Sequence, residues 1–141
     1  MEEKYFNRSF CRSLRNLEKS KFADPTAEFV LEGTIRNYIL TFDLAWKVMK
    51  DILVKQLGIT DFAIGSPREV LQSAFTNGLI SDDIWLKMLK TRNLLAHDYD
   101  GIIAKKNFRA IISNYYDAFD GLKDAITKFY DGSLLSIDGF D

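Results

Sequence analysis

The chain has 141 residues, 47% of them hydrophobic and 13% aromatic, which is long and apolar enough to bury the core of one domain. Its 19 lysines and arginines against 20 aspartates and glutamates leave a net charge of −1, which is not the overall charge of a nucleic-acid-binding protein, although a local basic face stays open. The lone Cys11 excludes an internal disulfide, and one cysteine with one histidine cannot form a zinc site within a protomer, so we expect neither a metal nor a cofactor.

Two proline-containing pairs mark the expected starts of helices. Asp24-Pro25 and Ser66-Pro67 each place a capping side chain directly before a proline at the first helical position. Glu69 follows Ser66 by three residues and completes a capping box. Helices are therefore predicted to begin at both pairs.

The apolar residues between these marks recur at spacings of four and three, which is the pattern of helices packed against helices. In one long predicted helix the recurring residues are Ile35, Ile39, Phe42, Trp46, Met49 and Leu53. Gly58 and Gly78 follow such runs, as residues that end helices commonly do. The predicted helices cover residues 3–22, 25–57, 66–77, 82–97 and 103–131.

These helices predict an all-α fold, an antiparallel four-helix up-and-down bundle with an extra short helix at 66–77. Residues 1–131 are expected to form a single domain, and 132–141 a C-terminal tail that is too short and glycine-broken to join the core. The first residues contain no continuous apolar run, and no stretch is long enough to span a membrane. We therefore expect a cytoplasmic protein without membrane contact.

A basic stripe follows helical spacing in the first predicted helix, opposite its apolar face. It consists of Arg8, Arg12, Arg15 and Lys19. Such a stripe is most often a solvated helix face. The functional alternative is contact with the phosphates of a nucleic acid, which makes these residues candidates for RNA binding.

The segment KTRNLLAHDYDG, residues 90–101, holds the only histidine of the chain. Arg92 continues the apolar spacing of the predicted helix 82–97, whereas Asn93 and His97 are i,i+4 neighbours on an adjacent face. A plain structural interpretation is open for both charged residues. An imidazolium near a helix C-terminus is favourable, and the arginine would pair with a buried carboxylate.

The R-(polar)-x3-H motif of the HEPN superfamily, with its H-x-Y extension, is matched position by position by Arg92, Asn93, His97 and Tyr99. The segments IRNYILTFDLAWKVMKDIL, SPREVLQSAFTNGLI and DDIWLKMLKTRN resemble the nucleotidyltransferase substrate-binding branch of that superfamily. This likeness covers roughly residues 5–130. The sequence departs from the branch's frequent R-N-x-x-x-H-T-Y at Asp98, among other positions, and Asp98 adds negative charge beside the motif.

The resemblance implies a helical homodimer that works with a cognate minimal nucleotidyltransferase. In toxin–antitoxin pairs of this kind the HEPN protein is a metal-independent ribonuclease, and the transferase silences it by adding AMP to the motif tyrosine. Carried onto this chain, the resemblance makes Arg92, Asn93 and His97 the catalytic residues, Tyr99 the modified residue and RNA a candidate partner. The alternative is a non-catalytic subunit that presents substrate to the nucleotidyltransferase.

The residue types of the motif fit RNA cleavage by the 2′-hydroxyl, which needs a base, an acid and a cation for the developing phosphorane. Histidine titrates near the working pH and serves as base or acid. Arginine stays charged and holds phosphate oxygens in a bidentate fork. Because each protomer has a single histidine, a twofold dimer that brings together Arg92 and His97 of both chains would supply both acid–base groups.

Overall fold

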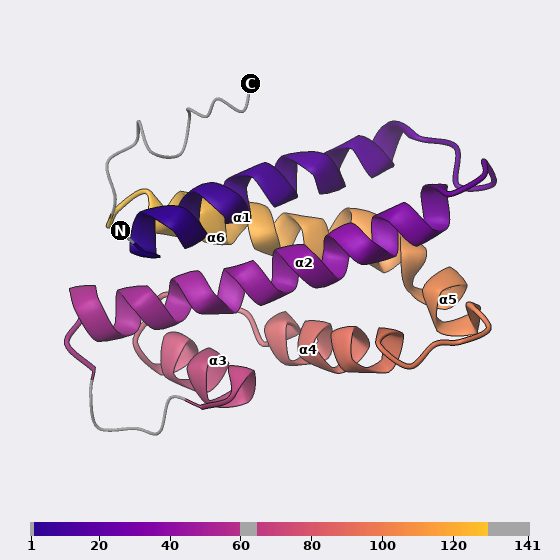
Figure 1. The fold of residues 1–141 in the computed structure, drawn as a ribbon. Coiled ribbons are helices and arrows are strands. Elements are labelled where there is room, and N and C mark those ends of the chain that lie inside the picture. The colour runs from indigo at the N-terminus through magenta and orange to yellow at the C-terminus, as the bar shows by residue number, and fades with distance from the viewer. Residues whose placement is uncertain (1, 60–64, 130–141) are drawn as a thin grey trace.

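The fold is seen in a computed structural model, which describes residues 2–59 and 65–129. Every regular element in these two ranges is a helix (Figure 1), so the predicted all-α class is confirmed for them. The predicted C-terminal tail, 132–141, lies outside the described residues. In the same two ranges no helix combines the length and the apolar character needed to cross a membrane.

The helices follow one another along the chain with short connections. In order they are α1 (Glu2–Lys19), the 3-10 turn η1 (Ser20–Phe22), α2 (Val30–Asp51), the π-helical turn η2 (Ile52–Gln56), α3 (Pro67–Thr76), α4 (Ile84–Leu95), α5 (Ile102–Ala110), the π-helical turn η3 (Ile111–Tyr115) and α6 (Tyr116–Ile126). In Figure 1, α1 and α4 run in one direction and α2 and α6 in the other. Helix α1 packs on α2 and α6, whereas α4 packs on α2, α3 and α5.

The start of α3 agrees with its predicted cap. Ser66 has extended backbone, Pro67 occupies the first helical position, and the Ser66 hydroxyl oxygen accepts a hydrogen bond from the Glu69 backbone N–H at 3.3 Å. The Ser66 hydroxyl also donates to a carboxylate oxygen of Glu69 at 3.1 Å. The capping side chain therefore satisfies one of the backbone donors that a helix N-terminus leaves without an intrahelical partner.

The start of α2 corrects the sequence prediction, because the helix begins at Val30 and not at Pro25. The Asp24 carboxylate accepts from both the backbone N–H and the hydroxyl of Thr26, at 2.9 and 2.7 Å, which folds this segment into a local turn. These hydrogen bonds lower the pKa of Asp24. Phe29 then adopts a left-handed conformation with φ 70° before the helix starts. Side-chain bonds of this type compete with helix formation.

The last predicted helix, 103–131, is interrupted by the π-helical turn η3 between α5 and α6. The buried residues nevertheless keep spacings of three and four through this turn: Ala104, Phe108, Ile111, Tyr115, Phe119, Leu122 and Ile126. Ile111 is fully buried, whereas its neighbour Ile112 is only half-buried. The helical path continues through α6 to Ile126 and ends in a turn.

The centre of the core is an aromatic cluster around Phe119 of α6. The Phe119 ring lies 6.2 Å from Phe10 of α1, 5.9 Å from Tyr38 of α2 and 5.5 Å from Trp85 of α4, measured between ring centroids. Edge-on and tilted pairs of this kind are favourable beyond the area they bury. One ring therefore ties together the long helices that position the rest of the molecule.

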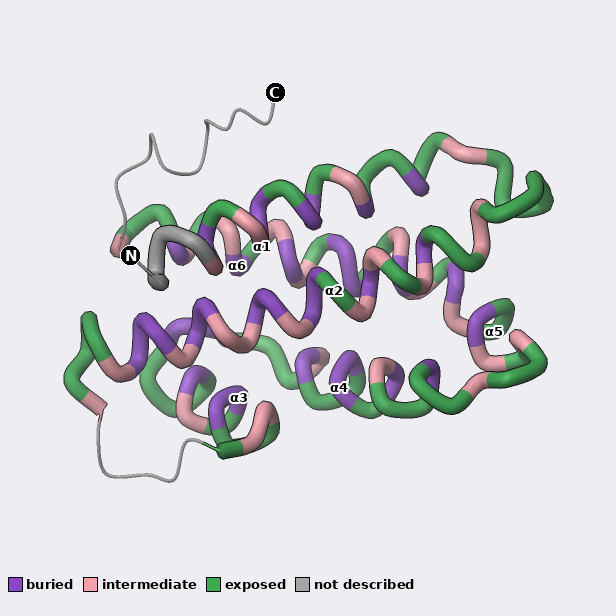
Figure 2. Tube along the Cα trace, viewed as in Figure 1, coloured by how far each residue is buried: buried purple, intermediate pink, exposed green. Residues whose placement is uncertain are grey.

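Helix α2 is turned so that part of its predicted apolar seam faces outward. The fully buried side is formed by residues such as Tyr38, Phe42 and Ala45. Ile39 of the predicted seam is only partly buried, and its neighbour Leu40 is 49% exposed. Figure 2 shows α2 running between α1 and α4 with exposed and intermediate residues along it. The apolar residues on this side of α2, such as Ile35 and Ile39, thus pack against the core but remain partly exposed.

A ladder of buried hydroxyl groups sets how α1 lies against α2. The Ser13 hydroxyl bonds to that of Thr41, which itself donates to the carbonyl of Asn37 at 2.6 Å. About two helical turns away, the Thr34 hydroxyl donates to the Ser20 hydroxyl at 2.7 Å. Both pairs are buried, and small side chains allow the two helices to approach closely.

Candidate functional site

Arg92, in the last turn of α4, is held by a carboxylate from α2. Its Nε donates to Asp43 Oδ1 at 3.0 Å and its Nη2 donates to Asp43 Oδ2 at 2.9 Å, a bidentate pair. The two side chains are 28% and 30% exposed, so the pair lies at the edge of the core. The hydrogen bonds that Arg92 donates to Asp43 raise the pKa of Arg92 further above its usual value. The structural interpretation of this arginine, pairing with a carboxylate, is confirmed.

The pair also limits what Arg92 does chemically. Guanidinium carries five N–H donors, and Asp43 engages two of them. The remaining donors suffice for a phosphate oxygen, but the flat Nε–Nη2 edge already holds a carboxylate. Any further acceptor would therefore have to approach the Nη1 side of Arg92 or displace Asp43.

The turn that carries Arg92 is anchored from the inside of the molecule. The Tyr38 hydroxyl, on α2, donates to the backbone carbonyl of Met88 at 2.6 Å, and burial raises the pKa of Tyr38 well above its ordinary value. The hydroxyls of Thr91 and Tyr115 are hydrogen-bonded at 3.0 Å. The second half of α4 is consequently fixed to both α2 and η3, which positions the residues that follow.

Asn93 and His97 are exposed at the end of α4. The helix ends at Leu95, two residues earlier than predicted, and the backbone N–H of His97 donates to the carbonyl of Leu94 at 3.1 Å. The imidazole therefore lies just beyond the helix, at the negative end of its dipole. Arg92, Asn93 and His97 are thus near one another because they are close in the sequence, on and just after the last turn of α4.

Asp98 has a structural role that the sequence reading missed. Its two carboxylate oxygens accept from the backbone N–H groups of Ile103 and Ala104 at 3.0 and 2.7 Å, while Asp100 accepts from Ile102 at 3.3 Å. These bonds cap α5 at the positive end of its dipole. The carboxylate of Asp98 therefore caps α5, a role that the sequence analysis did not assign to it, while it remains a negatively charged neighbour of His97. The sequence signal was an aspartate pair ahead of a glycine and an apolar helix.

Tyr99 lies between these two capping aspartates and is 92% exposed. Its hydroxyl is therefore reachable from outside the bundle. Because α4 has ended and the chain has turned before Tyr99, the ring does not pack on the apolar side of that helix. The side chains on both sides of it, Asp98 and Asp100, are hydrogen-bonded to the first turn of α5, so the phenol projects from a short connection that is tied to that helix.

The basic stripe is not part of this site within one protomer. Arg8, Arg12, Arg15 and Lys19 are exposed on α1, as predicted for such a stripe. Helix α1 packs on α2 and α6, and Figure 1 shows it on the other side of α2 from α4. The structure therefore separates the stripe from the Arg92–His97 turn.

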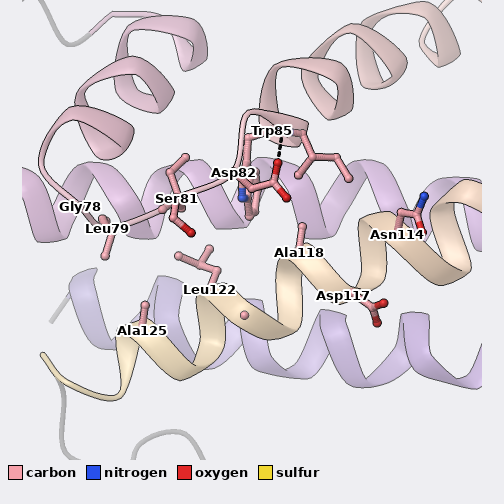
Figure 3. A pocket seen from close by; sticks show the side chains of 13 residues that line it. Gly78, Leu79, Ser81, Asp82, Trp85, Asn114, Asp117, Ala118, Leu122 and Ala125 are labelled. Carbon is pink, nitrogen blue, oxygen red and sulfur yellow. Dashed lines mark hydrogen bonds between the residues drawn. The ribbon is translucent and has the colours of Figure 1, made fainter.

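A hollow of about 410 Å³ lies on another side of α4, between the α3–α4 connection and α6 (Figure 3). Its polar side chains include Ser81, Asp82, Asn114 and Asp117. Asp82 is already used locally, because it accepts from the backbone N–H of Ile84 at 3.0 Å. The hollow shares none of the motif residues. Over the described parts of the chain, no three histidine, cysteine or acidic side chains are grouped as metal ligands.

Comparison with known proteins adds one finding to this geometry. The family model described as "Nucleotidyltransferase substrate binding protein like" matches residues 4–128. The match spans all the helices from α1 to α6 and includes the whole turn from Arg92 to Tyr99. No curated protein matches the chain in sequence.

Proposed function

We propose, from the premise that the chain belongs to the nucleotidyltransferase substrate binding protein-like family, that it is the partner of a nucleotidyltransferase and presents Tyr99 to that enzyme. The observation that carries the proposal is the exposure of Tyr99. A phenol that is 92% exposed contributes almost nothing to the core, yet the side chains of its two neighbours, Asp98 and Asp100, are held by capping bonds to α5. Such a side chain can enter the active site of the partner nucleotidyltransferase without local unfolding of this chain.

The reaction proposed for Tyr99 is transfer of AMP from ATP. The phenolic oxygen attacks the α-phosphorus, the new O–P bond forms, and the bond between the α-phosphorus and the bridging oxygen breaks. Pyrophosphate leaves, and the phenolic proton passes to a base of the transferase or to water. Magnesium and the base come from the transferase, so this chain supplies only the acceptor and its placement.

The adduct would change the charge of the neighbouring turn. A phosphodiester adds one negative charge, and the nucleoside adds bulk, two residues from His97 and seven from Arg92. The cationic groups of the turn are then occupied or covered. Modification at Tyr99 would therefore block access of another phosphate, such as that of RNA, to the same turn.

The second candidate function is metal-independent RNA cleavage by Arg92, Asn93 and His97, and the exposure of Asn93 and His97 favours it. In this role a histidine accepts the 2′-hydroxyl proton and another returns a proton to the leaving 5′-oxygen. The second histidine would come from the other chain of a homodimer. Because Asp43 holds the flat edge of Arg92, the presenting role is better supported than the nuclease role.

The acceptor role is tested by mixing the purified chain with its cognate transferase, ATP and magnesium and measuring intact mass. Wild type is expected to gain mass in steps of one AMP, and Tyr99→Phe is expected to gain none. Unchanged wild-type mass, or equal labelling of the variant, would remove Tyr99 from the function.

The nuclease role is tested with the unmodified chain. Incubation with total tRNA and mRNA in EDTA is expected to give cleavage for wild type and none for His97→Ala, both with the same circular dichroism. Intact RNA in the wild-type reaction, or cleavage that persists in His97→Ala, would reject the nuclease and leave the acceptor role standing.

A further inference from the structure

Another hollow lies at the end of the molecule where the connection from α1 to α2 meets α5. Figure 1 shows this connection and α5 at the same end of the bundle. The hollow has a volume of about 650 Å³, which is within the usual range for a ligand site. One wall is formed by the connection and the start of α2, and the other by α5. None of the motif residues from Arg92 to Tyr99 belongs to its lining.

Phe29 brings an aromatic ring to this hollow in a strained backbone conformation. Its φ of 70° and ψ of −4° are left-handed, a region that phenylalanine rarely adopts. The ring is 73% exposed, so packing in the core does not offset the strain. The backbone around it is nevertheless held, because the Val30 N–H donates to the Ala27 carbonyl at 3.2 Å and the Phe29 carbonyl accepts from Gly33 at 2.9 Å. A strained residue that is held in place without a role in the core suggests a role in binding.

Helix α5 contributes two cations to the hollow. Lys105 and Arg109 are i,i+4 neighbours, so they share one face of the helix, and both are exposed. The structure gives neither side chain an ion pair or a hydrogen bond with any residue in the described ranges. Their N–H donors are therefore open to an anion. Arginine holds phosphate oxygens in a bidentate fork, and lysine binds them as a point charge.

The wall formed by the connection and α2 is acidic. Glu28 lies just before α2 and Glu32 in its first turn, and both are exposed and line the hollow. Between the two walls the lining is apolar and includes Leu31 and the buried Phe108. Carboxylates accept hydrogen bonds but donate none. The hollow therefore offers donors for an anion on one side, acceptors for N–H groups on the other, and an aromatic ring beside both.

From this combination we propose that the hollow binds one nucleotide of a single-stranded RNA. The base stacks on the ring of Phe29, and its phosphate lies against Lys105 and Arg109. The exocyclic amine of the base donates to the acidic wall. Cations for the backbone beside an aromatic ring for the base are how proteins bind single strands. A bare phosphate matches only the basic wall and faces two carboxylates, whereas a nucleotide has a part for each surface of the hollow.

Helix α5 connects this hollow to the Arg92–Tyr99 turn. The helix begins at Ile102, three residues after Tyr99, and Lys105 completes its first turn. At a rise of about 1.5 Å per residue, Lys105 is only about 5 Å along the axis from the start of the helix. An RNA strand that reaches the turn therefore places a nearby nucleotide in the hollow. The binding site itself does not rest on the proposed function, because it needs neither AMP transfer nor cleavage.

The test measures binding of the full chain to a fluorescein-labelled 2′-O-methyl oligoadenylate of about 12 nucleotides, by fluorescence anisotropy in EDTA. The 2′-O-methyl group replaces the hydroxyl that cleavage needs, so the assay reports binding alone. Wild type is expected to bind, and Phe29→Asn is expected to raise the dissociation constant at least about fivefold through loss of stacking. Asparagine tolerates left-handed backbone, so this variant keeps its fold, which thermal melts check. Phe22→Asn, at a phenylalanine that is 84% exposed but outside the hollow, is expected to bind like wild type.

The phosphate contacts are tested with charge variants of α5. Lys105→Ala and Arg109→Ala are each expected to weaken binding and to reduce the slope of the logarithm of affinity against the logarithm of salt concentration by about one. The matched control is Lys106→Ala, which removes an exposed lysine of the same helix that does not line the hollow. This variant is expected to bind like wild type.

A wild type that does not bind the oligonucleotide overturns the proposal. Unchanged affinity in Phe29→Asn, or equal losses in Lys105→Ala and Lys106→Ala, would place the RNA elsewhere and also overturn it. AMP alone, added as a competitor, is expected to bind more weakly than the oligonucleotide. If AMP binds as tightly, the ligand is a free nucleotide and the assignment to RNA is rejected. AMP labelling of Tyr99, measured on the same variants, reports separately on the proposed function.

Discussion

Replacing Arg92 by alanine is expected to destabilise the fold as well as remove a cation from the exposed turn. The guanidinium makes two hydrogen bonds to Asp43, across 49 residues of chain, and so joins the end of α4 to the middle of α2. Its removal leaves the Asp43 carboxylate at the edge of the core without these two donors. The loss combines an ion pair with the desolvation of the acid left behind.

The expected size follows from the exposure of the pair. Ion pairs on the surface contribute about 0–1 kcal/mol. Removing one partner of a fully buried pair costs about 3–5 kcal/mol. With the side chains 28% and 30% exposed and the geometry bidentate, Arg92→Ala is expected to lower the free energy of unfolding by about 1.5–2.5 kcal/mol.

The coupling between the two residues is measured by a double-mutant cycle in urea. Wild type, Arg92→Ala, Asp43→Ala and the double variant are unfolded, and the interaction energy is expected to be about 1–2 kcal/mol. A coupling near zero would refute the reasoning that this contact stabilises the fold. Asp43→Asn separates stability from chemistry, because it keeps the charge of Arg92 while loosening its partner. If Arg92 binds phosphate, this variant is expected to bind RNA at least as well as wild type.

Three further substitutions test other features of the structure. Asn7 is fully buried on α1, and neither polar atom of its side-chain amide is hydrogen-bonded. Asn7→Leu is therefore expected to raise the free energy of unfolding by about 1 kcal/mol in urea melts. A loss of stability would contradict the inference that the buried amide destabilises the fold. Phe29 has φ 70° and is 73% exposed. Asparagine tolerates left-handed backbone, so Phe29→Asn is expected to stabilise the fold by about 1 kcal/mol in thermal melts. An unchanged melting midpoint would mean that the Phe29 ring stabilises the fold by as much as the strained backbone destabilises it. Asp98→Ala is expected to lower the free energy of unfolding by about 1–2 kcal/mol, because α5 loses its cap. Tyr99→Phe is expected to stay within about 0.5 kcal/mol of wild type. Equal effects of the two variants would contradict the assignment of Asp98 to the cap and of Tyr99 to an acceptor role outside the core.

The features that sequence predicted well are those decided by neighbouring residues. Ser66-Pro67 caps a helix because Glu69, three residues away, supplies the partner. Asp24-Pro25 has the same pattern but starts a turn, because Thr26 supplies two donors to the aspartate and no acidic residue follows at the third helical position. The two proline-containing pairs therefore differ because of Thr26, a residue that the capping rule does not consider.

The features that sequence missed depend on contacts between distant segments or on a single added residue. Nothing near Arg92 identifies Asp43 as its partner, since the two meet only when α4 packs on α2. The π-helical turn at Ile111–Tyr115 interrupts the last predicted helix although the buried residues on both sides keep spacings of three and four, so the apolar spacing alone does not reveal the turn. The capping of α5 by Asp98 and Asp100, on either side of Tyr99, was not predicted, because it depends on how the turn after α4 meets the start of α5.

The hydroxyl ladder between α1 and α2 bears on how the chain avoids wrong pairings during folding. A slip of α1 by one helical turn would keep many apolar contacts, because leucine and phenylalanine side chains tolerate exchange of neighbours. It would, however, separate Ser13 from Thr41 and Ser20 from Thr34 and bury these hydroxyls against hydrocarbon. Each buried hydroxyl without a partner costs about 1–3 kcal/mol, so the slipped state is disfavoured by more than the ladder stabilises the native one. The ladder thus widens the energy gap between the native alignment and its nearest competitor.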